Sequence, residues 1–217
     1  KSKLGVFFTT SFDNDYNTQL GVYDAELKAD GTIKNKFDKD SYTYSTLQTN
    51  LVNIAHISSK GSIIKANALY TSSTEDVIEQ KYNGWSNESD SLHIYNTEYT
   101  NSRLMYVQLL GKQTLQNNID IEWKTGYSNA FNNVPDRRQV SYIKNNNRWT
   151  VYNLNLQESL RAFIEQTEEI YSGELSATLK KEPIKTKFVF GTQAQYKTKE
   201  YQSYVYYYHL AGVNSIL

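Results

Sequence analysis

The sequence predicts an all-β fold, an antiparallel sheet of about seven long strands that forms a portion of a transmembrane β-barrel. Three observations predict it. Residues 117–131 alternate between apolar or aromatic side chains and charged or small ones, with a period of two. Several alternating stretches run for about ten to fifteen residues, whereas soluble strands usually have about five or six and a bilayer crossing takes about nine to eleven. The connections alternate between long polar stretches and short turns, as expected for long extracellular loops and short periplasmic turns.

Composition narrows the function classes. The 217 residues include 23 Lys and Arg, 23 Asp and Glu, 19 Tyr and no Cys. Balanced charge gives no sign of a nucleic-acid partner, and the lack of cysteine excludes disulfides and thiolate metal sites. Tyrosine suits a boundary between an apolar medium and water, because its ring is apolar and its hydroxyl is polar. No run of eighteen apolar residues suggests a membrane-spanning helix.

The first four strands are expected at 3–12, 44–57, 62–70 and 100–110. In the first, Leu4, Val6 and Phe8 share a face. In the second, Leu47 and Leu51 are in one phase with Ala55 and Ile57. A long polar stretch, 13–41, separates the first strand from the second, and another, 71–98, separates the third from the fourth. Residues 58–62 and 111–114 are expected to be short turns.

The next strand covers the alternating stretch 117–131, followed by "NNVPDRRQ" and a less regular region to about residue 166. A further strand is expected over 168–180, ending in the short turn 180–183, and the last strand starts at residue 184. Residues 157–170 fit helical spacing about as well as strand spacing. We favour strand, because the segment runs into 168–180 without a break signal.

Alternation also assigns the two faces. We expect one face to contact lipid and the other to line a polar lumen, with Glu122 and Lys124 as a lumen pair. The lipid-facing residues are Ile119, Ile121, Trp123, Tyr127, Phe188 and Phe190, and the lumen-facing residues are Asp120, Glu122 and Lys124.

Five stretches, taken in order, carry a family resemblance. They are "DSYTYST" (40–46), "NALYTSSTEDVIEQKYNGW" (67–85), "YTNSRLMYVQLLGKQTL" (99–115), "IEWKTGYSNAFNNVPDRRQVSY" (121–142) and "FVFGTQAQYKTKEYQSYVY" (188–206). Together they resemble the N-terminal part of the barrel domain of outer-membrane TonB-dependent receptors, in the group that carries a carboxypeptidase-like regulatory domain.

The resemblance implies a 22-stranded barrel in the outer membrane of a Gram-negative bacterium, closed around an N-terminal plug. Such a receptor imports a scarce nutrient with energy delivered by the TonB complex at an N-terminal box. Residues 1–217 correspond to a partial barrel domain, without plug, TonB box or the remaining strands. The implied partners are outer-membrane lipid, the plug and remaining strands, and TonB. The ligand and a surface lipoprotein lid are left open.

About seven strands cannot close a barrel of that size. An open sheet leaves two edges with unpaired backbone groups, which lipid does not tolerate. We therefore expect the chain to be part of a longer polypeptide or to be completed by another chain.

Ligand-binding candidates lie in the expected extracellular loops. Trp85, Tyr95 and Tyr99 could stack on a sugar or another ring, although rim aromatics at the membrane boundary are the commoner explanation. Arg137 and Arg138 could clamp a carboxylate or phosphate. The alternative is that Asp136 and one of these arginines pair with neighbouring loop or lumen charges and order the loop.

No catalytic residue, cofactor or metal site is expected. The histidines His56, His93 and His209 lack zinc-site spacing, and nucleophile motifs are missing, so an enzyme is not expected. Two other functions stay open. One is a soluble secreted β-sandwich that binds carbohydrate; the other is a passive outer-membrane channel or structural barrel subunit.

Overall fold

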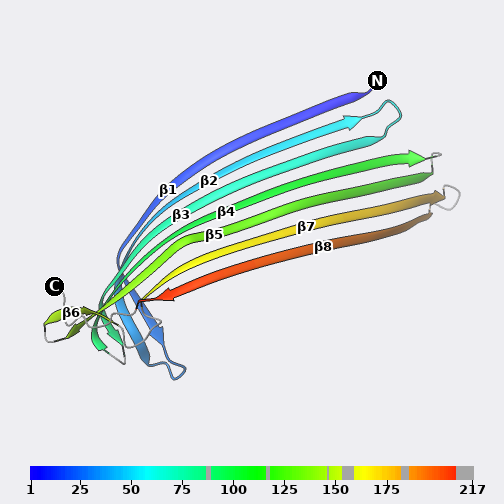
Figure 1. Ribbon diagram of the computed structural model, residues 1–217. Coiled ribbons are helices and arrows are strands. Elements are labelled where there is room, and N and C mark those ends of the chain that lie inside the picture. The colour runs from blue at the N-terminus through cyan, green and yellow to red at the C-terminus, as the bar shows by residue number, and fades with distance from the viewer. Residues whose placement is uncertain (87–88, 116–117, 146, 153–158, 182–185, 209–217) are drawn as a thin grey trace.

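A computed structural model describes residues 1–217 apart from 87–88, 116–117, 146, 153–158, 182–185 and 209–217. The described chain forms one antiparallel sheet in the order β1-β2-β3-β4-β5-β7-β8, with the short strand β6 paired to β5 (Figure 1). The predicted all-β, antiparallel architecture is confirmed. The strands are β1 (Lys3–Leu27), β2 (Ile33–Ile57), β3 (Ile63–Ser86), β4 (Ser89–Leu115), β5 (Ile119–Asn145), β6 (Arg148–Val151), β7 (Leu160–Lys181) and β8 (Thr186–Tyr207).

Two tight turns at opposite ends of the sheet share one geometry. In 28–32 the amide of Gly31 donates to the carbonyl of Lys28 (2.9 Å), and in 58–62 that of Gly61 donates to the carbonyl of Ser58 (3.0 Å). Both glycines have a positive φ, 82° and 83°. Glycine adopts this conformation without a steric penalty, so it closes such hairpins. The turn predicted at 58–62 is confirmed.

The polar stretches 13–41 and 71–98 are not excursions, and this expectation was wrong. β1 runs through 13–27 to the turn at 28–32, and β3 and β4 extend through most of 71–98. The backbone ladder needs no apolar side chains, so a strand with two polar faces carries no period-two signal. Described connections at both ends of the sheet are therefore short, contrary to the predicted long extracellular loops.

Other boundaries also differ from expectation. Residues 111–114 belong to β4 and not to a turn. "NNVPDRRQ" lies inside β5, where Pro135 falls at a register shift between Val134 and Arg137. Proline lacks an amide hydrogen, which explains its place at an irregularity. The strand favoured over 157–170 is confirmed for 160–170, while 157–158 lie outside the described residues.

The register joins the long strands into continuous rows. One row contains Ile64, Gly111, Trp123, Leu175 and Thr192. Directly paired residues point to the same face, so each row assigns side chains on different strands to one side of the sheet. We call the side that carries Trp123 face A, and the opposite side, which carries Glu122, face B.

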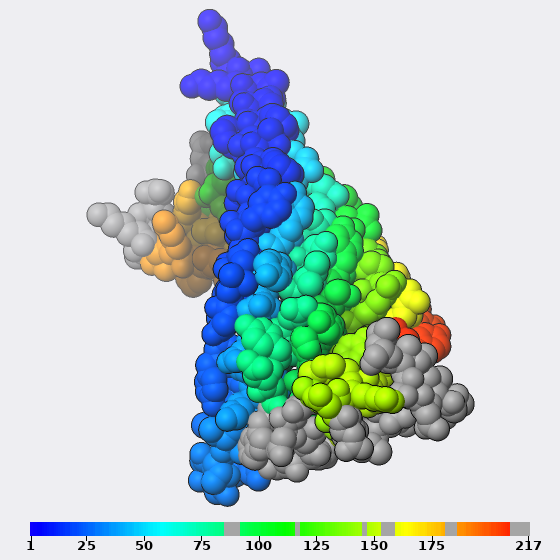
Figure 2. All heavy atoms as spheres, turned by 90° about the vertical axis from the view of Figure 1, so that its left-hand side faces the viewer, coloured from blue at the N-terminus to red at the C-terminus, as the bar shows by residue number. Residues whose placement is uncertain are grey.

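The sheet is a single layer with little core. The buried apolar side chains in the described chain are Leu92, Val134, Tyr152 and Ala162. They lie in the half of the sheet toward β6, since Leu92 pairs with Ile143 and Ala162 with Arg137 of β5. The edge strand β1 runs along the side of the molecule in Figure 2 and is exposed almost throughout. Most apolar side chains are therefore left without a protein core.

Candidate functional site: an apolar band and a charged ladder

Face A carries an apolar band near the end of the sheet where β1 starts. All six predicted lipid-facing residues lie on this face, because Ile119 aligns with Phe188 through Leu179, and Ile121 with Phe190 through Ala177. Phe190 is 67% exposed and Leu4 69%. The band consists of every second residue of 4–12, 48–56, 64–70, 105–115, 119–127, 171–179 and 188–196.

The band covers about nine residues of each strand, close to the roughly nine to eleven that a tilted strand needs to cross a bilayer. The seven long strands, all except β6, are 22 to 27 residues long. More than half of most strands therefore extends beyond the band, and we call this part the outer half.

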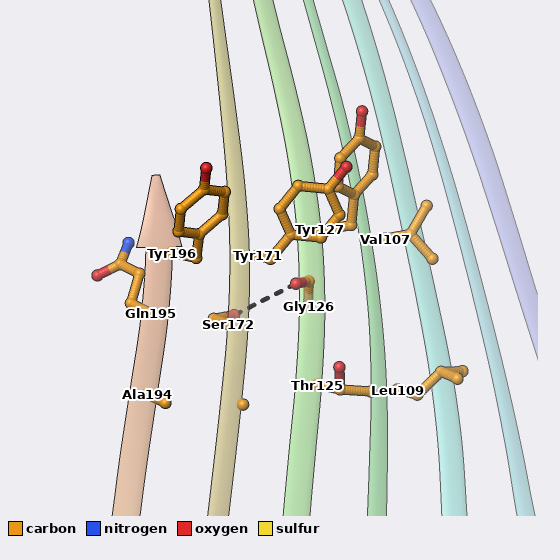
Figure 3. A pocket seen from close by; sticks show the side chains of 11 residues that line it. Val107, Leu109, Thr125, Gly126, Tyr127, Tyr171, Ser172, Ala194, Gln195 and Tyr196 are labelled. Atoms are coloured by element: carbon orange, nitrogen blue, oxygen red, sulfur yellow. Dashed lines mark hydrogen bonds between the residues drawn. The ribbon is translucent and has the colours of Figure 1, made fainter. Parts of the chain in front are cut away.

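A row of tyrosines borders the band. Tyr127, Tyr171 and Tyr196 occupy one register row, with ring centroids 4.9 and 6.5 Å apart. Below them the small residues Thr125, Gly173 and Ala194 leave a shallow groove of about 510 Å³ (Figure 3). Aromatic residues with polar tips at the edge of an apolar band are typical of the girdles of membrane barrels.

Face B carries a ladder of ion pairs behind the band. Lys112 pairs with Glu122 (2.5 Å), Lys124 with Glu174 (3.0 Å), and Asp120 with Lys180 (2.8 Å). The predicted lumen-facing residues Asp120, Glu122 and Lys124 thus share one face, as expected. Glu122 and Lys124 do not pair with each other, however, because each finds a closer partner on a neighbouring strand.

The predicted arginine clamp is not formed. Arg137 and Arg138 are neighbours in β5 and point to opposite faces, so they cannot grip one anion together. Arg137 lies 3.3 Å from Glu98, while Arg138 pairs with Asp136. Asp136 and Arg137 do pair with neighbouring charges, Arg161 and Glu98, as the alternative interpretation expected, but they lie in strand β5 and not in a loop.

Asp136 forms an ionic cluster with Arg138 and Arg161 in the outer half. Arg161 of β7 donates to Asp136 from Nε at 2.8 Å, and Arg138 donates from Nε at 2.7 Å. Hydrogen bonds from Arg161, then from Arg138, lower the pKa of Asp136 to about 2. The cluster ties β5 to β7 beside the irregularity at Pro135.

The other predicted ligand residues are not in loops. Tyr95 and Tyr99 belong to β4 and are 37% and 39% exposed. The backbone of Trp85 pairs with Lys36 in the β2–β3 ladder, and its side chain lies outside the described part. No group of three metal-binding side chains occurs among the described residues, and His209 lies outside them.

Sequence reasoning missed an aromatic cluster around His93. The His93 ring stacks on Tyr95 at 4.5 Å and meets Trp149 edge to face at 6.0 Å. Trp149 belongs to the short strand β6, more than fifty positions from His93. No local sequence pattern predicts the contact between His93 and Trp149, because it depends on the β4–β5 register and on the β5–β6 hairpin.

No helix long and apolar enough to cross a membrane occurs in the described chain. Comparisons with protein-family models, curated proteins and solved structures found no match to this chain. The resemblance in the sequence and the geometry of the two faces are therefore the grounds for assigning a function.

Proposed function

We propose that this chain forms part of the wall of an outer-membrane β-barrel of the TonB-dependent receptor type, which imports a scarce nutrient by energised transport. One observation carries the proposal: an apolar band on face A lies directly behind a ladder of ion pairs on face B. A sheet with one face in lipid and the other on an aqueous lumen requires this division.

A soluble β-sandwich is the weaker interpretation. In a sandwich the apolar face of one sheet packs against a second sheet about 10 Å away. The strands in the described part of this chain all belong to one sheet, and large side chains such as Phe8 and Phe190 stay 61% and 67% exposed. Exposed apolar surface on this scale calls for a partner medium or protein.

The two edges support a larger assembly. Within the described residues, β1 pairs only with β2, and β8 only with β7. Each backbone N–H or C=O group left unpaired in lipid costs roughly several kcal/mol of free energy. In the proposal, further strands of the same barrel pair with both edges, whether they come from the same polypeptide or from another chain.

The outer half then extends from the membrane on the extracellular side, where the receptor captures its ligand. The energised step belongs to the plug and the TonB complex, and the residues described here line or support the passage. A passive channel shares the same two-faced sheet. Uptake that continues unchanged in cells without TonB would favour the channel.

Heat modifiability tests the proposal. The native full-length protein is recovered from fractionated membranes and run on a gel with and without boiling. We expect it in the outer membrane, with a folded band that shifts on boiling. Recovery of residues 1–217 without detergent as a stable soluble monomer would instead mean that face A packs into a protein core.

A further inference from the structure

A cleft of about 720 Å³ lies in the outer half, beyond the apolar band. This volume falls in the range of small-molecule sites, about 300–1,000 Å³. On β3 the lining residue Gln80 is ten positions beyond Tyr70, which places it roughly 33 Å further along the strand. The residues used below are Asp40, Gln80, Tyr82, His93, Lys144 and Trp149.

The cleft opens on face A and not on the lumen side. Asp40 pairs with Gln80, and Gln80 pairs with Tyr95, two positions from His93. On β3, Gln80 has the same even parity as Ile64 and Tyr70 of the band, with no register shift between them. The cleft is therefore separate from the polar face that would line a transport path.

Aromatic rings form one side of the cleft. His93 lies at 6.3 Å from Tyr82 and 6.0 Å from Trp149, both edge to face. Trp149 remains 40% exposed. Burial lowers the pKa of His93 below its usual value, which favours the neutral imidazole. The rings thus offer a neutral imidazole and a partly exposed indole, with the ammonium of Lys144 5.9 Å from the centroid of the Trp149 ring.

Polar atoms without partners lie beside these rings. Oδ1 of Asp40 accepts hydrogen bonds from the Gly21 amide (2.8 Å) and the Tyr82 hydroxyl (3.1 Å), which fixes the carboxylate. Within the described chain its Oδ2 has no hydrogen-bond partner. The side chains of Gln80 and Lys144 likewise form no hydrogen bond or ion pair there. One carboxylate oxygen and one amide therefore have no hydrogen-bond partner in the described chain, and the Lys144 ammonium has no anionic partner there, although it lies 5.9 Å from the centroid of the Trp149 ring.

We infer that this cleft binds a neutral saccharide. A sugar ring presents a C–H face that packs on aromatic rings, and hydroxyls that both donate and accept hydrogen bonds, so it matches both groups of residues. The carboxylate of Asp40 opposes a phosphate or sulfate, and Lys144 alone does not outweigh it. The saccharide comes either from the polysaccharide of the cell's own surface or from free glycan in the medium.

Binding of labelled oligosaccharides to the detergent-solubilised full-length protein tests this inference. The neutral probes are oligomers of glucose, mannose, galactose and N-acetylglucosamine, and polysaccharide released from the host's own lipopolysaccharide. Heparin and polygalacturonate are the acidic probes. The variants are Trp149→Ala and Gln80→Ala. The control is Tyr16→Ala, an exposed tyrosine of β1 outside the cleft.

We expect at least one neutral probe to bind, Trp149→Ala and Gln80→Ala to weaken that binding at least tenfold, and Tyr16→Ala to leave it unchanged. Binding of the released polysaccharide alone would identify the cell surface as the source; binding of a free oligomer would identify the medium. Three results would overturn the inference: no neutral probe binds, only acidic probes bind, or the cleft variants behave like Tyr16→Ala. The gel shift on boiling shows separately whether each variant is folded.

Discussion

The indole of Trp123 covers Gly111, its register partner on β4. A Cβ atom added at Gly111 would lie 2.1 Å from the Cε2 atom of Trp123. Gly111 is buried in a sheet whose faces are otherwise largely open, because the ring lies over its backbone. A large aromatic ring opposite a glycine shields that backbone and fixes the local register.

Gly111→Val is therefore expected to expel the indole and to destabilise the folded form by about 1–3 kcal/mol, as overpacking does. Urea titration of the folded gel band measures the loss, and tryptophan emission reports the displaced ring. The matched control is Gly173→Val, on the same face, where an added Cβ has nothing within 4 Å. Equal stability of the two variants would show that the position of the Trp123 ring does not require a glycine at residue 111.

A charge on face A is expected to cost far more than the same charge on face B. Leu109→Arg places a guanidinium in the band and should destabilise the protein in vesicles by about 2–4 kcal/mol. Gln108→Arg changes the next residue, on face B, and should cost about 1 kcal/mol or less, including the hydrogen bond that Gln108 accepts from Asn67. Denaturant titration after refolding into lipid vesicles measures both. Comparable losses would argue against lipid contact on face A.

The ladder on face B predicts a charge-reversal pattern. Glu122→Lys sets two lysines side by side, because Lys112 lies 2.5 Å from Glu122. Both side chains are more than 40% exposed, so solvent screens the pair and we expect only a small loss of stability. Reversing both residues should restore most of that stability. A double variant no more stable than Glu122→Lys would show that the pair contributes nothing.

Asp136 predicts a dependence on pH. Its pKa falls from 3.8 to about 2 in the folded protein, so the folded state binds fewer protons than the unfolded state between these values. The stabilisation is present above about pH 4 and is lost as the pH falls toward 2. Wild type should therefore melt at a higher temperature than Asp136→Asn at pH 6, and the difference should shrink steadily as the pH falls from 4 through 2. A constant difference across this range would exclude the ion pairs as its cause.

Much of the sheet could be predicted from period-two alternation, but only where one side of a strand is apolar. The alternation in residues 117–131 predicted the first part of β5, because Ile121 and Trp123 alternate with Asp120 and Glu122. The outer half of β1 could not be predicted in this way, since its few apolar residues, such as Leu20, Val22 and Tyr23, fall in both phases among polar ones. The pattern of side chains indicates which medium surrounds each face of a strand. It does not indicate whether the backbone forms the hydrogen bonds of a strand.

Register was the second limit. Leu47, Leu51 and Ala55 are in one phase in the sequence, yet the β1–β2 pairing places them opposite Asp13, Thr9 and Gly5, on face B. Their neighbours Val52 and Ile54 align with Phe8 and Val6 on face A instead. A strand with apolar residues in both phases cannot be oriented without its partner. For the same reason the cleft could not be predicted, since its residues come from five strands, β2 to β6.

Quenching of Trp123 by brominated lipid tests the central claim most directly. The full-length protein, with every other tryptophan replaced by phenylalanine, is refolded into vesicles whose acyl chains carry bromine. If face A contacts lipid, bromine near the bilayer centre should quench Trp123 strongly, while iodide in the water should have little effect. Quenching by iodide but not by brominated chains would place Trp123 in water, and quenching by neither would place it in a protein core; either result would contradict the account.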